Sequence, residues 1–500
     1  MKSPGADAAR LTENDSSTAA RGIERTPMDW IFAGITGIVA LLAIGNWRAA
    51  LYGCLLLDVA RDPVRKLTEQ QSSLMTVIVG FVWLAAMLGA LSTESRESRM
   101  LFRRYPRLQT SLILLVVALL PGALISTTRF NNGWMLAAIG AASYTAPFVG
   151  VVLGYLWPRR VGDVYRWMAA YVIINSAFLI GVVLESAAID IPGLGGLKSN
   201  EIGGDGLKME WVRNYGTDLI KLICGFYRSP DVMGLHAAHV IMFGVLLALR
   251  PGKRSAWFWL SLCTWAMTCL LLCGRRKMIA IPLVFLVAYL ALVALSSGRK
   301  RIAISMATFA VTVILGLQFV IETQEISDDY ARYAASIASE GFERTTRTVT
   351  EIISTTIDQS GWLGDGLGTV TQGRQYLGVI TKTRDWQEDG VGRLFKELGV
   401  PGVVLAVASI VFMLGALRSS FDAIPTGHPV LSLQFGIFGI VAANFASFVV
   451  SHQAYSGDPS TVLIVGFCLG IGLGLPRPVW ANAVRESPRP IAEAEPAGPE

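Results

Sequence analysis

Residues 255–296 read SAWFWLSLCTWAMTCLLLCGRRKMIAIPLVFLVAYLALVALS, two apolar runs on either side of one basic turn. Each run, 255–273 and 278–296, has about 19 residues, and a helix of that length, at about 1.5 Å per residue, crosses most of a hydrocarbon core of about 30 Å. Neither run contains a charged residue. We therefore expect two membrane-spanning helices joined by almost no linker.

The composition of the whole chain also indicates a membrane protein. Of its 500 residues, 52% are hydrophobic and 16% are charged, with a mean hydropathy of +0.49, whereas soluble domains contain about 25% charged residues. The net charge of +6 does not indicate nucleic-acid binding, because the basic residues form short clusters between apolar runs. Such clusters are typical of membrane topology signals, so no nucleic-acid partner is expected.

Apolar runs of this length recur along the chain and predict an all-α polytopic membrane protein with about twelve transmembrane helices. The candidate spans are 29–46, 73–92, 109–127, 134–157, 167–186, 233–250, 255–273, 278–296, 302–321, 399–417, 430–450 and 460–476. The first run is long for a signal sequence and no clear cleavage pattern follows it, so it is predicted to be retained. Leu51 to Ala60 is apolar but too short to span, and it is predicted to be a segment that dips into the membrane or lies at its interface.

These spans divide the chain into five segments. Residues 1–28 and 477–500 have the composition of disordered tails, and both are expected in the cytoplasm. Residues 29–321 hold transmembrane helices 1–9, residues 322–398 form an extracytoplasmic loop, and residues 399–476 hold helices 10–12.

The distribution of Lys and Arg sets this orientation, because short cytoplasmic loops are enriched in both. With a cytoplasmic N-terminus, most basic clusters lie inside. They are Arg96 to Arg107, Arg159-Arg160 with Arg166, Arg250 to Arg254, Gly298 to Arg301, and Arg418. A cost of this orientation is that Arg61, Arg65 and Lys66 lie outside.

The predicted outer loop has about 77 residues, from Glu322 to Leu398. Loops of that length in compact proteins are more often functional than idle. Four apolar residues within it fall at helical spacing and predict an amphipathic helix on the outer surface. They are Val349, Ile352, Ile353 and Ile357.

Metal and cofactor chemistry is not indicated by the sequence. The six cysteines lie mostly inside apolar runs without a CxxC pair, and we expect packing roles for them. His236 and His239 have no further ligand at metal-binding spacing, so a structural or polar-network role is expected. No DxD pair and no GxxxxGK[ST] loop occurs. No metal and no cofactor are expected.

Two basic segments predicted to lie outside are candidate anion sites. Gly274-Arg275-Arg276-Lys277 presents guanidinium groups that match phosphate oxygens, although an ordinary inside loop is the alternative. Arg228 directly precedes a predicted helix start, where free N–H groups also favour an anion. The alternative there is a capping turn formed by Ser229 or Asp231.

Carboxylates gather where the long loop re-enters the membrane. This stretch runs from Asp385 through Glu388 and Asp389 to Arg393 and Gly399. Carboxylates at a membrane boundary cost free energy unless they pair with a cation or take part in function. A solvated turn is the alternative interpretation.

The order of these segments resembles the superfamily of O-antigen ligases and Wzy-type O-antigen polymerases. The resemblance starts at the run Tyr227 to Gly234 and continues through Gly274-Arg275-Arg276-Lys277. It includes Arg344 and Arg347, the turn Trp362 to Gly368, which is similar to the family's GxG turn, and the run Glu388 to Gly402. It covers about residues 220–475. Family ligases have histidine eleven residues before the glycine, and that position, counted from Gly399, is Glu388.

The resemblance implies a metal-independent, inverting glycosyltransferase in the bacterial inner membrane, with its active site facing the periplasm. Its donor would be an oligosaccharide on undecaprenyl diphosphate, transferred to a glycan acceptor. Arg275, Arg276 and Arg228 would bind the diphosphate and Glu388 would be the general base. Secondary candidates are Asp389, Arg344, Arg347 and Arg393.

The resemblance leaves the exact reaction open. An exopolysaccharide or O-antigen polymerase is the first expectation, and a ligase that transfers glycan to lipid A core is the nearest alternative. Transfer to protein is a third. Membrane lipid and other polysaccharide-assembly proteins are the expected neighbours. The competing class is a polysaccharide transporter or flippase, but no internal repeat typical of transporters is found.

Overall fold

The structure is a computed structural model, and it describes most of the helical part of the chain. The described residues are 27–67, 74–187, 189, 200–202, 208–210, 212–215, 218–250, 255–296, 351–371, 374, 389–452, 455 and 458–477.

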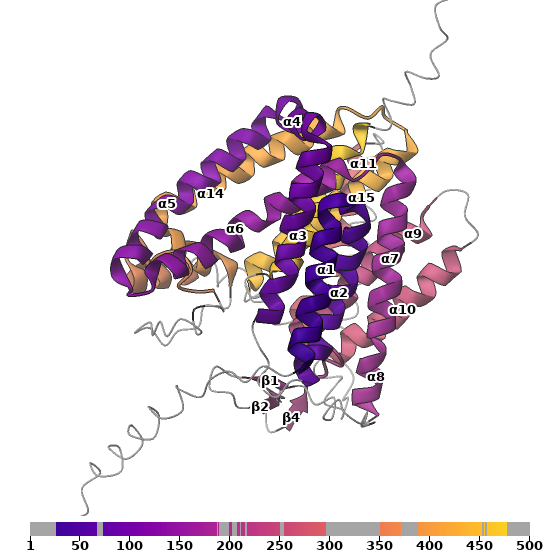
Figure 1. Cartoon of the computed structure of the whole chain (residues 1–500), viewed down its shortest axis with the longest axis horizontal. Coiled ribbons are helices and arrows are strands. Elements are labelled where there is room, and N and C mark those ends of the chain that lie inside the picture. Colours follow the sequence, from indigo (N-terminus) through magenta and orange to yellow (C-terminus); the bar gives the residue numbers. More distant parts are fainter. Residues whose placement is uncertain are drawn as a thin grey trace, which may run out of the picture.

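Helices form nearly all of the described chain (Figure 1). They are α1 (Pro27–Gly45), α2 (Trp47–Leu67), α3 (Leu74–Thr93), α4 (Ser95–Arg104), α5 (Pro106–Arg129), α6 (Gly133–Leu156), α7 (Val161–Phe178), α8 (Ile180–Ser186), α9 (Pro230–Ala248), α10 (Ala256–Leu272), α11 (Arg276–Ser296), α14 (Gly390–Phe421), α15 (Pro429–Val450) and α17 (Pro459–Gly474). The strands are β1 (Asn200–Ile202), β2 (Lys208–Glu210), β3 (Val212–Tyr215) and β4 (Asp218–Lys221).

The four strands form two short antiparallel hairpins that the sequence analysis did not predict. β1 pairs with β2, with Asn200 opposite Glu210, and β3 pairs with β4, with Val212 opposite Lys221. They connect α8 to α9 and lie beyond the helix ends (Figure 1). With this exception the described chain is helical, so the predicted fold class of a helical membrane protein is confirmed.

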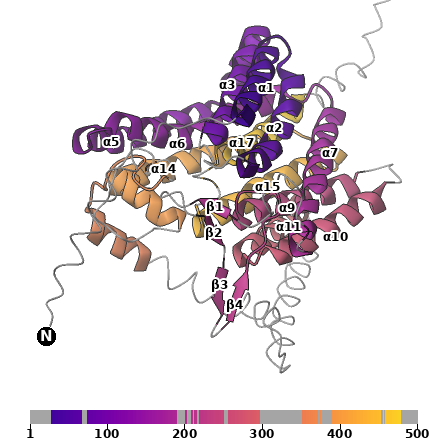
Figure 2. The same cartoon turned by 60° about the horizontal axis from the view of Figure 1, so that its bottom comes forward.

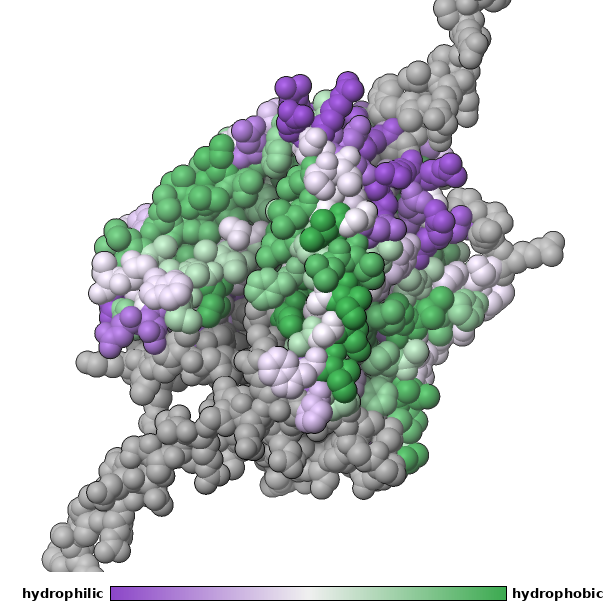
Figure 3. Space-filling model, in the orientation of Figure 1, coloured by the Kyte–Doolittle hydropathy of each residue, from purple (hydrophilic) through white to green (hydrophobic). Residues whose placement is uncertain are grey.

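The predicted spans coincide with helices wherever the chain is described. Within the described residues, eight helical segments are long and apolar enough to cross a membrane, with α7 and α8 counted as one, or nine if the bent pair Ile78–Thr93 and Ser95–Arg104 counts as one span. α10 and α17 are shorter apolar helices, and the predicted span 302–321 lies outside the described residues. The number twelve therefore stays a prediction. Apolar side chains cover the sides of the helical body (Figure 3).

Part of the predicted outer loop is also described. Residues 351–360 are helical, and Ile352, Ile353 and Ile357 are less exposed than most of their neighbours. This agrees with the predicted helical spacing. Val349 and most of the remaining loop lie outside the described residues, so its position on the outer surface stays a prediction.

The interfacial position predicted for Leu51 to Ala60 is wrong. This stretch is the middle of α2, a continuous helix of 21 residues that packs along α1 and α3 (Figures 1 and 2). The charges at the end of this stretch and just after it face the interior of the bundle, where Asp58 is 4%, Arg61 1% and Asp62 2% exposed. Hydropathy misses α2 because its charges have protein partners instead of water.

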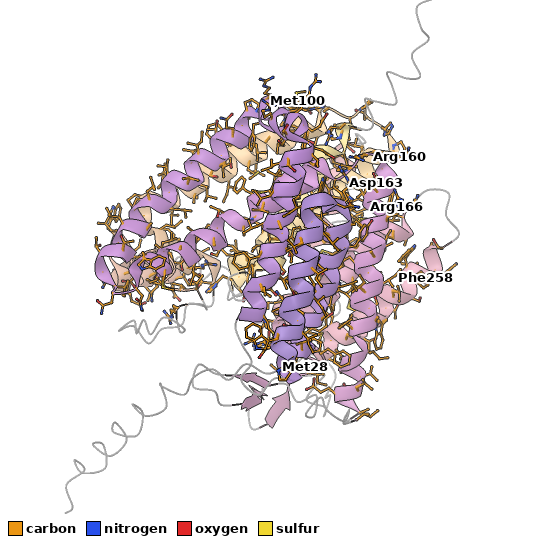
Figure 4. All side chains as sticks on the ribbon, in the orientation of Figure 1. Met28, Met100, Arg160, Asp163, Arg166 and Phe258 are labelled. Carbon is orange, nitrogen blue, oxygen red and sulfur yellow. The ribbon has the colours of Figure 1, made fainter. Side chains whose placement is uncertain are left out.

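α2 separates two segments that were predicted to lie on the same side. Met28, at the start of α1, and Met100, in α4, lie at opposite ends of the helical body (Figure 4). The cytoplasmic N-terminal tail and the cytoplasmic Arg96 to Arg107 loop are therefore incompatible predictions. We call the end with α4 the arginine end. Its arginines include Arg48, Arg96, Arg99, Arg103, Arg104, Arg107, Arg159, Arg160, Arg166, Arg418 and Arg477.

Glycines let α6 and α17 approach closely. A Cβ atom at Gly154 would lie 2.0 Å from the carbonyl oxygen of Phe467, and one at Gly470 would lie 2.2 Å from that of Val151. Small residues at helix contacts are the usual basis of tight packing in membranes, because lipid supplies no hydrophobic drive between helices. This contact fixes the start of α17, which carries part of the site described below.

We expect Gly154→Ala to lower the thermal unfolding midpoint in detergent, because the new methyl group would overlap the backbone of α17 and overpacking costs about 1–3 kcal/mol. The control is Gly34→Ala in α1, where a Cβ atom would meet no heavy atom within 4 Å. Equal midpoints for both variants would contradict the close contact.

Candidate functional site

α9 begins with a capped turn that places Arg228. The Ser229 side chain accepts a hydrogen bond from the backbone N–H of Val232 at 3.3 Å, and Pro230 occupies the first helical position. The predicted capping turn is therefore present. It orients Arg228 inward, where its side chain is buried and its Nη2 atom lies 3.7 Å from Asp458 Oδ2.

Arg228 belongs to a buried cluster that we call the inner network, which consists of Asp58, Arg61, Asp62, Arg228 and Asp458. Arg61 lies at its centre: its Nη2 atom is 3.0 Å from Asp58 Oδ1 and also donates to Asp458 Oδ2. Its Nε atom is 3.7 Å from Asp62 Oδ1. The backbone N–H of Arg228 donates to Asp62 Oδ2 at 3.1 Å. The network thus joins α2 to the starts of α9 and α17.

One acid of this network, Asp458, is held ionised by its partners. Asp458 caps α17 through a hydrogen bond from the Ser460 N–H at 3.0 Å. Burial alone would raise the pKa of Asp458, but Arg61 and Arg228 hold that pKa below its ordinary value. A carboxylate with a depressed pKa stabilises the fold above its unfolded pKa, and this stabilisation is lost as the pH falls through the folded pKa.

A second cluster, the outer network, consists of Asp231, Arg275, Lys277 and Ser451. Asp231 Oδ2 lies 3.3 Å from Arg275 Nε, and Asp231 Oδ1 lies 2.9 Å from Lys277 Nζ. Lys277 also donates to Ser451 Oγ at 2.7 Å. Gly274, with φ of +64°, supplies the left-handed turn that reverses the chain between α10 and α11.

The two networks meet at the first turn of α9, because Arg228 and Asp231 are three residues apart. They differ in access to solvent. The side chains of Arg275 and Lys277 are 20% and 16% exposed, whereas those of Arg228 and Arg61 are 9% and 1% exposed. A ligand from outside the protein would therefore meet Arg275 and Lys277 first, with the buried network as support.

The charges of this region nearly balance. The cations are Arg61, Arg65, Lys66, Arg228, Arg275 and Lys277, and the carboxylates are Asp58, Asp62, Glu185, Asp231 and Asp458. Among the described side chains, six cations therefore face five carboxylates, one positive charge in excess. Near balance is what burial requires, and the excess favours an anionic ligand.

Several predicted site residues cannot be placed. Glu388, Arg344 and Arg347 lie outside the described residues. Arg276 begins α11, and its side chain is likewise not described. Asp389 is described and caps α14 by accepting a hydrogen bond from the N–H of Gly392.

The start of α14 lies next to the end of α15. A Cβ atom at Gly390 would lie 2.3 Å from the carbonyl oxygen of Phe448, three residues before Ser451 of the outer network. The first residue of α14 therefore lies close to the end of the helix that precedes Ser451. Because the Asp389 carboxylate is used as a cap, a structural role is the simpler interpretation for it.

Arg393 has a structural partner that sequence analysis missed. Its Nε atom lies 3.1 Å from Glu397 Oε2, and its guanidinium lies over the Tyr144 ring, 4.8 Å from the ring centroid. Glu397 also accepts the Tyr144 hydroxyl at 2.8 Å and the backbone N–H of Val370 at 3.0 Å. The pair thus fastens α14 to α6 and to the glycine turn that follows residue 360.

That glycine turn is locked in place. Gly364, Gly366 and Gly368 all have positive φ, at 80°, 110° and 86°. A Cβ atom at Gly368 would lie 2.2 Å from the carbonyl oxygen of Leu136, so only glycine fits. The Asp365 N–H donates to the carbonyl oxygen of Lys396 at 2.7 Å, which ties the turn to α14. The turn resembling the family's GxG motif is therefore a packing element in this structure.

His236 and His239 take part in a polar network, as the sequence analysis expected. The Tyr171 hydroxyl lies 2.8 Å from His236 Nδ1 and 3.3 Å from His239 Nδ1. His239 Nε2 lies 3.1 Å from Asn444 Oδ1. Among the described residues, no group of three His, Cys, Asp or Glu side chains is arranged to hold a metal ion.

Comparisons with models of protein families, with curated proteins and with solved structures give no match to the chain. The interpretation of the site therefore rests on its own geometry and on the resemblance of the motifs.

We expect Arg61→Met to destabilise the protein strongly, because it leaves Asp58 and Asp458 buried without their shared cation, and breaking a buried pair costs about 3–5 kcal/mol. The measurement is the thermal or denaturant midpoint in detergent. The matched control is Arg166→Met, whose side chain is 71% exposed; pairs of this kind contribute about 0–1 kcal/mol. Similar midpoints for both variants would show that the inner network does not support the fold.

Proposed function

We propose that the chain is a membrane glycosyltransferase that joins glycan units carried on undecaprenyl diphosphate, as an exopolysaccharide or O-antigen polymerase. The observation that supports it is the pair of partly exposed cations, Arg275 and Lys277, held on Asp231 beside buried Arg228. A guanidinium and an ammonium at a helix boundary match the charge and the donor geometry that a diphosphate needs.

The orientation in the membrane is part of the proposal. The arginine end faces the cytoplasm, because arginines crowd it and the positive-inside rule places such clusters there. The outer network lies at the starts of α9 and α11 and opens to the periplasm. Since α1 to α3 run side by side, this orientation puts Met28, at the start of α1, on the periplasmic side, whereas the sequence analysis predicts residues 1–28 in the cytoplasm.

The chemistry follows from these positions. An acceptor hydroxyl oxygen attacks the anomeric carbon, the bond from that carbon to the diphosphate oxygen breaks, and undecaprenyl diphosphate leaves with the electron pair. Arg275, Arg276 and Lys277 stabilise the charge that develops on the leaving group, and Arg228 supports them from the buried side. Glu388 takes the hydroxyl proton in this proposal, because the Asp389 side chain caps α14.

The acceptor of the glycan determines whether such an enzyme is a polymerase or a ligase. Transfer to a growing glycan makes a polymerase, and transfer to lipid A core makes a ligase. Both reactions use the same donor and the same cation site, so the described geometry does not discriminate between them. Other polysaccharide-assembly proteins are the proposed partners.

A transporter is the second candidate, and the inner network favours it. Intramembrane ionisable residues mark ion or substrate pathways in many transporters. Here Asp58, Arg61 and Asp62 are buried within α2. A transporter would move the lipid-linked glycan across proteoliposomes without consuming it, whereas a glycosyltransferase lengthens the glycan in detergent.

We expect purified protein to lengthen glycans on undecaprenyl diphosphate, and Arg275→Ala to reduce donor turnover by about 10²-fold, in the range found for lost transition-state donors. Arg275→Lys should restore only part of the activity, because an ammonium lacks the planar fork of a guanidinium. The measurement is glycan length by gel or mass spectrometry.

Arg166→Ala, at the arginine end, is the control and should keep full activity. Full turnover in Arg275→Ala would remove this arginine from the donor site. An unchanged donor with wild-type protein, together with its passage across proteoliposomes, would favour the transporter.

A further inference from the structure

α4 crosses the arginine end of the molecule instead of continuing α3. The two helices are bent by 94° at Glu94. Since α3 runs alongside α1 and α2 through the apolar body, α4 lies close to parallel with the membrane plane (Figures 1 and 3). A helix of this kind at the head-group level contacts lipid along its whole length.

The two faces of α4 differ in chemistry. Ser98 and Leu101 are buried against the protein, and Glu97 on that side pairs with Arg477 at 3.0 Å. The residues on the opposite face recur every three to four positions, as one face of a helix requires, and they are exposed. Its residues are Arg96, Arg99, Met100 and Arg103.

The exposed arginines of α4 differ from the other arginines near them. Arg48 and Arg159 both contact Glu94 Oε1, at 2.5 Å and 2.8 Å. Within the described chain, by contrast, Arg96, Arg99 and Arg103 form no ion pair with a carboxylate, and the hydrogen bond of Arg99 goes to the Ser95 carbonyl oxygen, at 3.3 Å.

Unneutralised guanidinium groups in one row attract anions, and the position of the row selects the anion. Three arginines in the plane of the cytoplasmic leaflet face lipid phosphates at the highest local concentration available to them. Met100, 46% exposed between them, adds an apolar side chain at the depth of the upper acyl chains. An acidic soluble protein would match the charge, but not an apolar residue in the middle of the basic row.

We propose that α4 is a binding site for anionic phospholipid head groups, with Arg96, Arg99 and Arg103 contacting the phosphates. The site anchors the corner between α3 and α5 to the leaflet. It rests on the orientation given under the proposed function but not on the glycosyltransferase chemistry, because α4 contributes no residue to the outer network.

The test uses the purified full chain in neutral detergent, titrated with phosphatidylglycerol or with phosphatidylcholine of the same acyl chains. Bound lipid is counted by native mass spectrometry. Wild-type protein should bind phosphatidylglycerol at least about 10-fold more tightly than phosphatidylcholine. The variant R96Q/R99Q/R103Q should lose at least about 10-fold of that affinity, since each basic residue near an anionic surface contributes about 1 kcal/mol, or about fivefold. Its binding of phosphatidylcholine should not change.

The control variant R159Q/R160Q/R166Q removes the same number of charges from the same end and should keep the preference for phosphatidylglycerol. Equal losses in the two variants would show a general charge effect and overturn the assignment to α4. Absence of the preference in wild-type protein would also overturn it. Displacement of the lipid by an equal concentration of inorganic phosphate would identify a site for soluble anions instead. Unchanged thermal midpoints in lipid-free detergent establish that both variants fold.

Discussion

Arg61 carries a charge into the interior of a bundle that lipid surrounds, and such a charge is tolerated only with partners of opposite sign. It has three carboxylates within reach, Asp58, Asp62 and Asp458. Two of them lie on its own helix, and Asp458 lies at the start of α17. The ion pairs therefore do more than neutralise α2: they fix where α17 begins, and through Asp458 they reach Arg228 at the start of α9.

The partly exposed cations depend on this buried arrangement. The first turn of α9 contains Asp231, which holds Arg275 and Lys277. If α9 began elsewhere, these cations would have no fixed position at the membrane boundary. The opposite end of the molecule uses cations differently. There the exposed arginines of α4 have no carboxylate partners in the described chain, which is why we propose a lipid site at that end and a donor site at the other.

The sequence predicts this fold wherever a helix is apolar over its own length, because hydropathy then reports burial in lipid directly. It fails at α2, where Arg61 and Asp58 make the local sequence look unsuited to a membrane. The partner that explains them, Asp458, is 397 residues away in the chain, and no local pattern reveals such a pair.

For the candidate site, too, the sequence pointed to some residues but not to their distant partners. Arg228 and Arg275 stand out as basic residues at helix boundaries, and the structure brings them to the same turn of α9. Their carboxylate partners are Asp231 and Asp458, and from the sequence alone these two residues indicate no more than helix caps. Arg393, a secondary candidate from the sequence, pairs with Glu397 one helical turn later, and its role in the site stays a prediction. A basic residue four positions before a buried carboxylate is the signal that sequence analysis passed over.

The central claim is that the cation site and the arginine end face opposite sides of the membrane. Labelling of intact cells with an impermeant thiol reagent tests it directly, with single cysteines introduced at exposed Trp362 and Met100. The six native cysteines are buried and should give little background. We expect the Trp362→Cys protein to be labelled from outside and the Met100→Cys protein to be labelled only after permeabilisation. Labelling of Met100→Cys but not Trp362→Cys in intact cells would contradict it.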